Sequence, residues 1–180
     1  MLIVRDTSDL NTALQTVAKT HHLKKVPEKA KSLYRPFWLG KAIYTGQRRD
    51  RTRIEGTIVF IADARIMGWA IIGAYQHRRI EDVLDLRKHN VDFVVDEKEP
   101  EEGADVLEVM IEKEQLPSRA YLLRGRRMLS RAMGMGKIKF DEDIEYHLVY
   151  RPYWEIEFQR KNGEADAAMI SRDEILVRGR

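Results

Sequence analysis

The sequence predicts an α+β protein built from two related helix-plus-antiparallel-sheet halves, whose sheets can join into one continuous sheet. The first observation is a repeat: Tyr-Arg-Pro-aromatic-Trp occurs at 34–38 and again at 150–154, 116 positions later. The second is a stretch of helical periodicity before each copy. The third is an apolar residue or a proline at every even position from 144 to 158. A motif that recurs in the same local order indicates an internal duplication.

The first half begins with a helix that Thr7 or Ser8 can cap. Six residues at helical spacing would form its buried face: Leu10, Ala13, Leu14, Val17, Ala18 and His21. Pro27 lies in a charged connector to the first Tyr-Arg-Pro strand, and further strands are expected at 56–63 and 66–75. In the first motif strand, apolar residues occur at both odd and even positions, so we expect that strand to be covered on both faces.

The middle of the chain contains the predicted boundary. A polar, helix-compatible stretch at 78–90 leads to an apolar stretch at 91–95. Residues 96–105 then hold six acidic residues in ten and a proline, which predicts an exposed loop or a linker. We therefore divide the chain into a first half at 1–95, an acidic loop or linker at 96–105, and a second half at 106–180.

The second half repeats the order of helix and then motif strand. Ser118 can cap its helix, whose proposed buried face consists of Tyr121, Met128, Ala132 and Met135. Period-two alternation over 144–158 predicts one long strand with a single buried face, with Tyr150 inside and Arg151 outside. Proline cannot donate to a ladder, so Pro152 predicts a sheet edge or a bulge, where a second chain could pair if no neighbouring strand covers it.

The segments that follow the two motifs also correspond. Residues 54–66 align with 163–175, which places Phe60 on Met169 at a spacing of 109. The seven-residue difference from 116 predicts a longer hairpin loop in the first copy.

The repeated motif has two interpretations. It is an aromatic anchor in the core, or it is a pair of exposed platforms on which bases or sugars stack. The regular alternation favours the core. The residues concerned are Tyr34, Arg35, Trp38, Tyr150, Arg151 and Trp154.

Composition narrows the function. Without cysteine, the chain has no thiol nucleophile, zinc-thiolate site or disulfide. No apolar run approaches the roughly 20 residues of a membrane span, so we expect a cytoplasmic protein. Gly134-Met-Gly-Lys resembles a phosphate loop but lacks its first glycine, since position 131 is arginine. We expect no catalytic residues, cofactor or metal, and a non-enzyme is favoured over an enzyme.

Two arginine clusters are the candidate polyanion-binding residues: Arg48, Arg49, Arg51 and Arg53 in a hairpin loop, and Arg124, Arg126, Arg127 and Arg131 on the second helix. The helix cluster can equally be a solvated face. The loop can equally be neutralised by the acidic residues at 96–105.

Three functions remain. The leading one is a non-enzymatic binding or assembly module, with a protein partner or a second copy of the chain. The alternative is nucleic-acid binding through the arginine-rich loop and helix. The third is a metal-dependent enzyme, for which Asp143, Glu145 and His147 alternate on one face of the long strand.

The order of a helix, strands and a strand ending in "FIADARIMG" is similar to that of PepSY-like and cystatin-like repeats, in which a helix packs on a small antiparallel sheet. The similarity covers about half of the chain, and its turn from Asp63 to Gly68 is one residue longer than the Asp-x-x-x-Gly of those repeats. It is an analogy of architecture that implies neither activity nor family membership.

Overall fold

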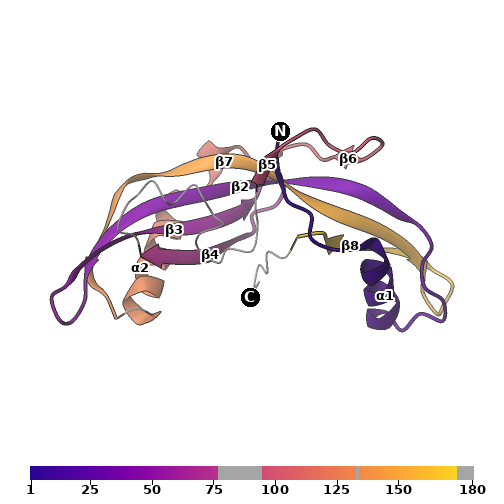
Figure 1. Ribbon diagram of the computed structural model, residues 1–180, viewed down its shortest axis with the longest axis horizontal. Helices are drawn as coiled ribbons and strands as arrows, with labels where there is room; N and C mark the ends of the chain where they lie inside the picture. Colours follow the sequence, from indigo (N-terminus) through magenta and orange to yellow (C-terminus); the bar gives the residue numbers. More distant parts are fainter. Residues whose placement is uncertain (77–94, 133, 174–180) are drawn as a thin grey trace. The chain divides into compact units, whose positions relative to one another are not determined.

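A computed structural model describes residues 1–76, 95–132 and 134–173, and within them the chain is α+β, as the sequence predicts (Figure 1). The strands of this part are β1 (Leu2–Val4), β2 (Ala30–Gln47), β3 (Arg53–Asp63), β4 (Trp69–Gln76), β5 (Val95–Glu97), β6 (Asp105–Val106), β7 (Gly136–Gln159) and β8 (Ala165–Ser171). The helices are α1 (Leu10–Thr20), the 3-10 helix η3 (Lys113–Gln115) and α2 (Ser118–Ala132). The helix expected at 78–90 lies outside the described residues. No helix in these ranges has the length and apolarity needed to cross a membrane.

The chain forms two compact units, and the two long strands β2 and β7 contribute to both. Among the described residues, unit 1 comprises 1–36, 95–108 and 149–173, and unit 2 comprises 37–76, 109–132 and 134–148. Each unit therefore combines segments that are distant in sequence. The halves predicted at 1–95 and 106–180 follow the order of the chain instead, and their common origin stays a prediction.

In unit 2, an antiparallel sheet is built on β3, the most continuously buried strand of the protein. β3 pairs with β2 from Phe37↔Asp63 onward, and with β4 on its other side. A register shift between Val59 and Phe60 marks an irregularity in the second ladder. β7 is the other neighbour of β2. Because β3 is paired on both sides, its apolar side chains form the centre of the core.

The core of unit 2 joins this sheet to α2. Trp38 and Phe60 from the strands lie in one buried cluster with Tyr121 and Leu129 from the helix. At Gly125 the helix comes so close that an added Cβ would lie 2.8 Å from Ile58 Cδ1. The absence of a side chain at this position is what allows α2 to pack directly on the sheet.

In unit 1, α1 packs on the hairpin of β7 and β8. Leu14 and Val17 share a buried cluster with Trp154 and Ile156. The helix is capped by Asp9, whose carboxylate accepts from the backbone N–H of the residue at position 12 at 3.0 Å. The cap predicted at Thr7 or Ser8 is therefore wrong by one or two positions, and an aspartate performs the same role as an acceptor.

The two hairpins have loops of equal length. Five residues separate the last ladder pairs on each side, Gln47↔Arg53 in one hairpin and Gln159↔Ala165 in the other. The expected longer loop in the first copy is wrong, because the extra residues extend the ladder instead. The pairing also differs from the alignment by one position: Gly40 pairs with Phe60, and the residue 116 later, Ile156, pairs with Ala168 instead of Met169. A one-residue shift changes the face of every side chain.

The motif tryptophans confirm the core interpretation but not its details. Tyr34, Trp38 and Trp154 are buried, at 1%, 8% and 9% exposure. Neither tryptophan packs on the helix that precedes its own motif in the sequence. Trp38 packs with α2 and Trp154 with α1, because each motif strand passes from one unit into the other near its Tyr-Arg-Pro.

One of the two alternatives predicted from Pro152, an open sheet edge, is wrong at that residue. β7 has β2 on one side and β1 and β8 on the other. Pro152 lies between Tyr150, which pairs with β1, and Tyr153, which begins the pairing with β8. Its missing N–H thus falls where one neighbouring strand replaces another, while its carbonyl accepts from Arg172 N at 2.9 Å. β7 therefore offers no open edge at this position to a second chain.

Candidate functional site

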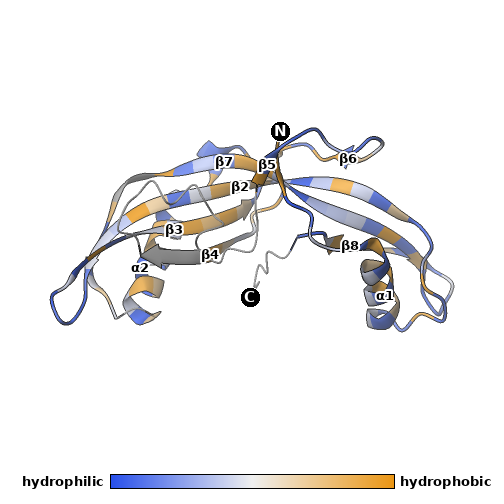
Figure 2. Ribbon diagram, viewed as in Figure 1, coloured by the Kyte–Doolittle hydropathy of each residue, from blue (hydrophilic) through white to orange (hydrophobic). Residues whose placement is uncertain are grey.

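The loop between β2 and β3 has a defined shape. Arg48 N donates to Thr52 O at 2.9 Å, and Arg51 N donates to Arg48 O at 3.0 Å. The Asp50 carboxylate accepts from Thr52 N at 2.9 Å, and this hydrogen bond is the main cause that lowers the pKa of Asp50. Arg51 has a φ of 68°, a left-handed conformation that reverses the chain. The loop is strongly hydrophilic and its arginines are exposed (Figure 2).

A second basic segment, residues 136–139, lies beside this loop. Met135 is buried against Gly46, where an added Cβ would lie 2.4 Å from Met135 Cε. Lys137 and Lys139 follow at alternate, exposed positions of β7 and therefore share a face of that strand. Close packing between methionine and glycine thus places two lysines next to the hairpin, at the end of unit 2 where α2 also ends (Figure 1).

An open pocket of about 240 Å³ joins the two segments. Its lining consists of Thr45, Gly46, Gln47, Arg53, Lys137 and Lys139. Three of these six residues are cationic and none is acidic. The pocket therefore suits an anionic group that is presented from solvent.

The charge of this region exceeds that of the whole chain. Residues 45–55 and 136–139 carry six arginines and lysines against two acidic residues, a net +4, whereas the complete sequence carries +3. Within the described part of the chain, Arg49, Arg51 and Arg53 have no ion-pair partner, and neither do the two lysines. Like charges held this close raise the local potential and attract polyanions. We give the name basic tip to the six cations of these two segments, which are Arg48, Arg49, Arg51, Arg53, Lys137 and Lys139.

The four candidate arginines of α2 have different environments. All four predicted residues are exposed. Arg131 lies in the last turn of the helix, four residues before the buried Met135 that packs against Gly46. Arg124 instead places its guanidinium 5.8 Å from the centre of the Trp69 ring, a cation–π contact over the sheet of unit 2. The structure thus leaves Arg131 in the last turn of α2 and gives Arg124 a packing role.

The remaining predicted site residues belong to the interior. Arg151, expected to face outward, is 4% exposed and binds Asp173 through two hydrogen bonds of 2.9 and 2.7 Å. Tyr150 is half-buried and pairs with β1. Arg35 is also half-buried. With the tryptophans buried, the motif does not form an exposed stacking platform.

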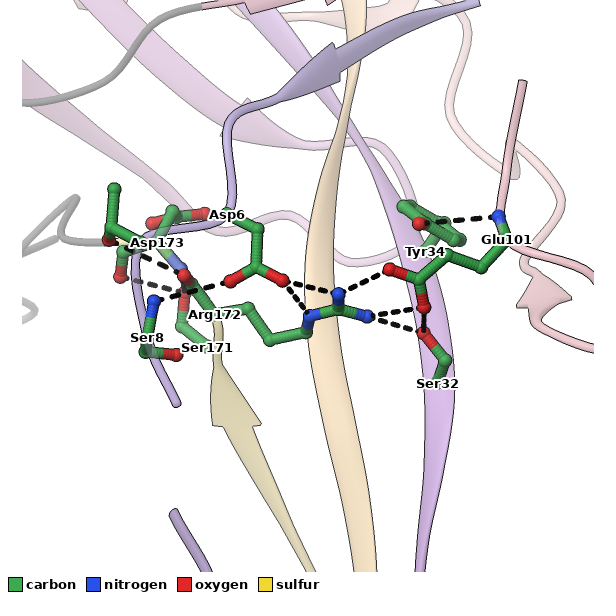
Figure 3. Close-up of polar contacts among 9 residues, drawn as sticks. Asp6, Ser8, Ser32, Tyr34, Glu101, Ser171, Arg172 and Asp173 are labelled. Carbon is green, nitrogen blue, oxygen red and sulfur yellow. Dashed lines mark hydrogen bonds and ion pairs between the residues drawn. The ribbon is translucent and has the colours of Figure 1, made fainter. Parts of the chain in front are cut away.

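Unit 1 contains an ionic cluster around the buried Arg172, which was not predicted from the sequence. The Arg172 guanidinium lies between the carboxylates of Asp6 and Glu101, with Ser32 beside Glu101 (Figure 3). Its Nε donates to Asp6 at 2.7 Å and its Nη1 donates to Glu101 at 2.9 Å. The hydrogen bond from Arg172 is the main cause that lowers the pKa of Glu101 to about 2. The guanidinium also lies 5.1 Å from the centre of the Trp154 ring. No sequence spacing connects these residues, so only the fold reveals the cluster.

The acidic segment at 96–105 makes its ion pairs inside unit 1. Asp96 binds Arg5 at 2.9 Å, and Glu101 belongs to the Arg172 cluster. Asp105 pairs with Lys31. These partners fix the segment against unit 1, so that it serves as a structural element of that unit.

Two of the residues considered for metal binding, Glu145 and His147, contact each other. Glu145 accepts from Lys41 at 2.8 Å, and this hydrogen bond is the largest cause that lowers the pKa of Glu145. His147 Nε2 lies 2.8 Å from the same carboxylate. No cluster of three or more metal-ligating side chains occurs in the ranges that the structure describes.

The two lysines of the basic tip were not predicted from the sequence. The available signal was their alternate spacing at the start of a strand that follows a helix. That spacing indicates a basic site only once it is known that the β2–β3 hairpin lies beside this segment.

A comparison of the chain with protein-family models, curated proteins and solved structures finds no match.

Proposed function

We propose that this protein binds the phosphate backbone of nucleic acid through the basic tip. The observation that carries the proposal is that cations from two distant chain segments, Arg53 and the lysines at 137 and 139, line one pocket with no acidic residue among its described lining, while three more exposed arginines lie in the adjoining loop. Arginine forks bind phosphate through paired hydrogen bonds, and lysines add point charges.

The residues around the pocket favour contact with the backbone over contact with bases. None of the described residues that line the pocket is aromatic, and the nearby Tyr44 is fully buried. Base stacking requires an exposed ring, so the basic tip does not supply the platform that single-strand binding proteins use. Phosphate contacts position a protein without reading sequence. The proposed binding is therefore independent of sequence and sensitive to salt.

Replacing Arg48, Arg49, Arg51 and Arg53 together with serine should weaken binding to duplex DNA and RNA while leaving the melting temperature nearly unchanged. Exposed charges contribute little to stability. Loss of four phosphate contacts should reduce the slope of log K against log salt by up to about 3.6. Fluorescence anisotropy across a salt series measures the slope, and thermal unfolding checks the fold.

A charge-matched control comes from α2. Serine at Arg119, Arg124, Arg126 and Arg127 removes the same charge outside the basic tip and should retain most of the affinity and slope. Equal losses in both variants would show that net charge, and not this site, governs binding. A loop variant with the same affinity and the same salt dependence as the wild type would contradict the proposal.

Protein contact is the second candidate function, favoured by a separate observation. Ile66, Met67 and Met110 are exposed at 58%, 69% and 63%. They gather at one turn of unit 2, since Met110 N donates to Ala64 O at 2.8 Å and the Arg65 side chain contacts the Met110 sulfur. Exposed apolar clusters of this kind are typical of contact surfaces.

The test of this second candidate is self-association. If a second copy covers the cluster, light scattering should show a dimer that becomes a monomer when Ile66, Met67 and Met110 are replaced with serine. A wild-type chain that is monomeric throughout a dilution series would exclude a second copy as the partner.

A further inference from the structure

Unit 1 carries a second basic surface, built in the same way as the basic tip. In unit 2, a hairpin loop lies beside the segment that follows a helix. In unit 1, the β7–β8 loop at 160–164 lies beside the segment at 21–29 that follows α1. We propose that this second surface is another backbone-phosphate site, so that one chain makes two separate contacts with nucleic acid. The ligand class rests on the proposed function, whereas the site stands on its own geometry.

The two segments of unit 1 enclose two adjoining hollows. The larger is an open pocket of about 700 Å³, lined by Leu23, Lys24, Lys25, Val26, Pro27, Glu28, Lys29, Glu157, Phe158, Gln159, Arg160 and Lys161. The shallower one is lined by Thr20, His21, His22, Arg160, Lys161 and Asn162. Arg160 and Lys161 line both hollows. Five cations against two carboxylates give the larger pocket a net charge of +3.

Packing fixes the helix-exit segment beside the hairpin. The His21 ring packs against Phe158 in a tilted arrangement, with centres 4.5 Å apart, and Phe158 is buried on β7. His22 has a φ of 52°, and Leu23 N donates to Ala18 O at 2.9 Å, which turns the chain at the end of α1. The lysines that follow are therefore held next to the loop by the fold.

The cations of this surface differ in how available they are. Arg160 donates to the Asp166 carboxylate at 2.7 Å, and this ion pair neutralises the charge of the arginine. Lys24, Lys25, Lys29 and Lys161 are exposed and have no ion-pair partner among the residues that the structure describes. The lysines are thus the groups that would contact phosphate.

The shape of the surface favours a polymer over a small anion. Its hollows are wide and open, and its free cations are flexible lysines, not a converging set of buried donors. Point charges spread along an open surface match successive phosphates of a backbone. Two such surfaces on one chain would raise the overall affinity through effective concentration.

The experiment uses the full chain and a DNA duplex of one helical turn, about 10 bp, in low salt, with binding counted by native mass spectrometry and measured by anisotropy. We expect two duplexes per wild-type chain. Serine at Lys24, Lys25 and Lys161 should reduce the number to one. Serine at Lys31, Lys98 and Lys113, three exposed lysines outside both proposed sites, two in unit 1 and one in unit 2, is the matched control and should still bind two.

The outcomes separate this inference from the proposed function. If the lysine-site variant binds duplex in the same number and with the same affinity as its lysine control, the second site is wrong, whatever the basic tip does. If the loop variant of the basic tip matches its own α2 control, the proposed function is wrong, while a loss in the lysine-site variant would still establish the site of unit 1.

Discussion

Replacing Trp38 with alanine is expected to lower the free energy of unfolding by about 3 to 5 kcal/mol. The indole is 8% exposed and lies in the core between the sheet of unit 2 and α2. Its Nε1–H donates to Ile111 O at 2.7 Å, so the truncation also leaves this carbonyl without its donor. Urea unfolding measures the loss. The matched control is Met67→Ala, which removes an exposed apolar side chain and should stay within about 0.5 kcal/mol of the wild type.

Amide hydrogen exchange tests which helix depends on which tryptophan. Trp38→Ala should accelerate exchange in α2 and leave α1 nearly unchanged, because Trp38 packs with Tyr121 and Leu129. Trp154→Ala should do the reverse, since its partners are Leu14 and Val17. Faster exchange in α1 on replacing Trp38 would mean that each helix packs on the motif strand that follows it, against the arrangement described above.

Replacing Arg172 with alanine is expected to cost about 3 kcal/mol, at the lower end for breaking a buried ion pair. Arg172 is 5% exposed and holds two carboxylates, whereas the side chains of Asp6 and Glu101 are 26% and 50% exposed. Water can therefore reach the acids after the arginine is removed, which limits the penalty. The variant also loses the contact with the Trp154 ring. Arg5→Ala, which breaks the exposed pair with Asp96, is the control and should cost under about 1 kcal/mol.

Acid titration gives a second measurement on the same variant. The pKa of Glu101 is lowered from 4.5 to about 2, mainly by its hydrogen bond from Arg172. A carboxyl with a depressed pKa in the folded protein stabilises it above the ordinary pKa, and that contribution is lost as the pH falls through the folded value. The stability difference between the wild type and Arg172→Ala should therefore shrink between pH 4.5 and pH 2. A constant difference over this range would mean that Glu101 does not take part in the cluster.

Local periodicity predicted the two helices and the motif strands, but only part of their buried faces, since Leu10, His21 and Ala132 are exposed. The spacing of Leu14 and Val17 identified the buried face of α1, and the alternation from Pro152 to Phe158 identified the buried face of β7. Both patterns depend on the regular geometry of one element, which the sequence records directly.

The relations between elements could not be predicted in the same way. Pro152 indicated an edge or a bulge, but the strand has neighbours on both sides because β8 begins where β1 ends. The alternation along β7 predicted that Arg151 faces outward. The side chain is instead buried, because Asp173 from a later segment neutralises it. In each case a partner that is distant in sequence decided the environment.

The candidate site shows the same division. The loop arginines were found because Arg48 to Arg53 are contiguous in sequence. Lys137 and Lys139 were missed because their approach to the loop depends on the packing of Met135 against Gly46. A cluster assembled from two segments becomes visible only when the contact between them is known.

α1 packs on the strand of the second motif and α2 on the strand of the first, and this arrangement has a consequence during protein synthesis. All described elements of unit 2 have been made once the ribosome has passed Leu148, whereas unit 1 also needs the β7–β8 hairpin. Trp154 is translated 134 residues after Thr20, the last residue of α1. At 5 to 20 residues per second this delay is about 7 to 27 s. For that time the apolar face of α1 is without the strand residues that cover it in the folded protein.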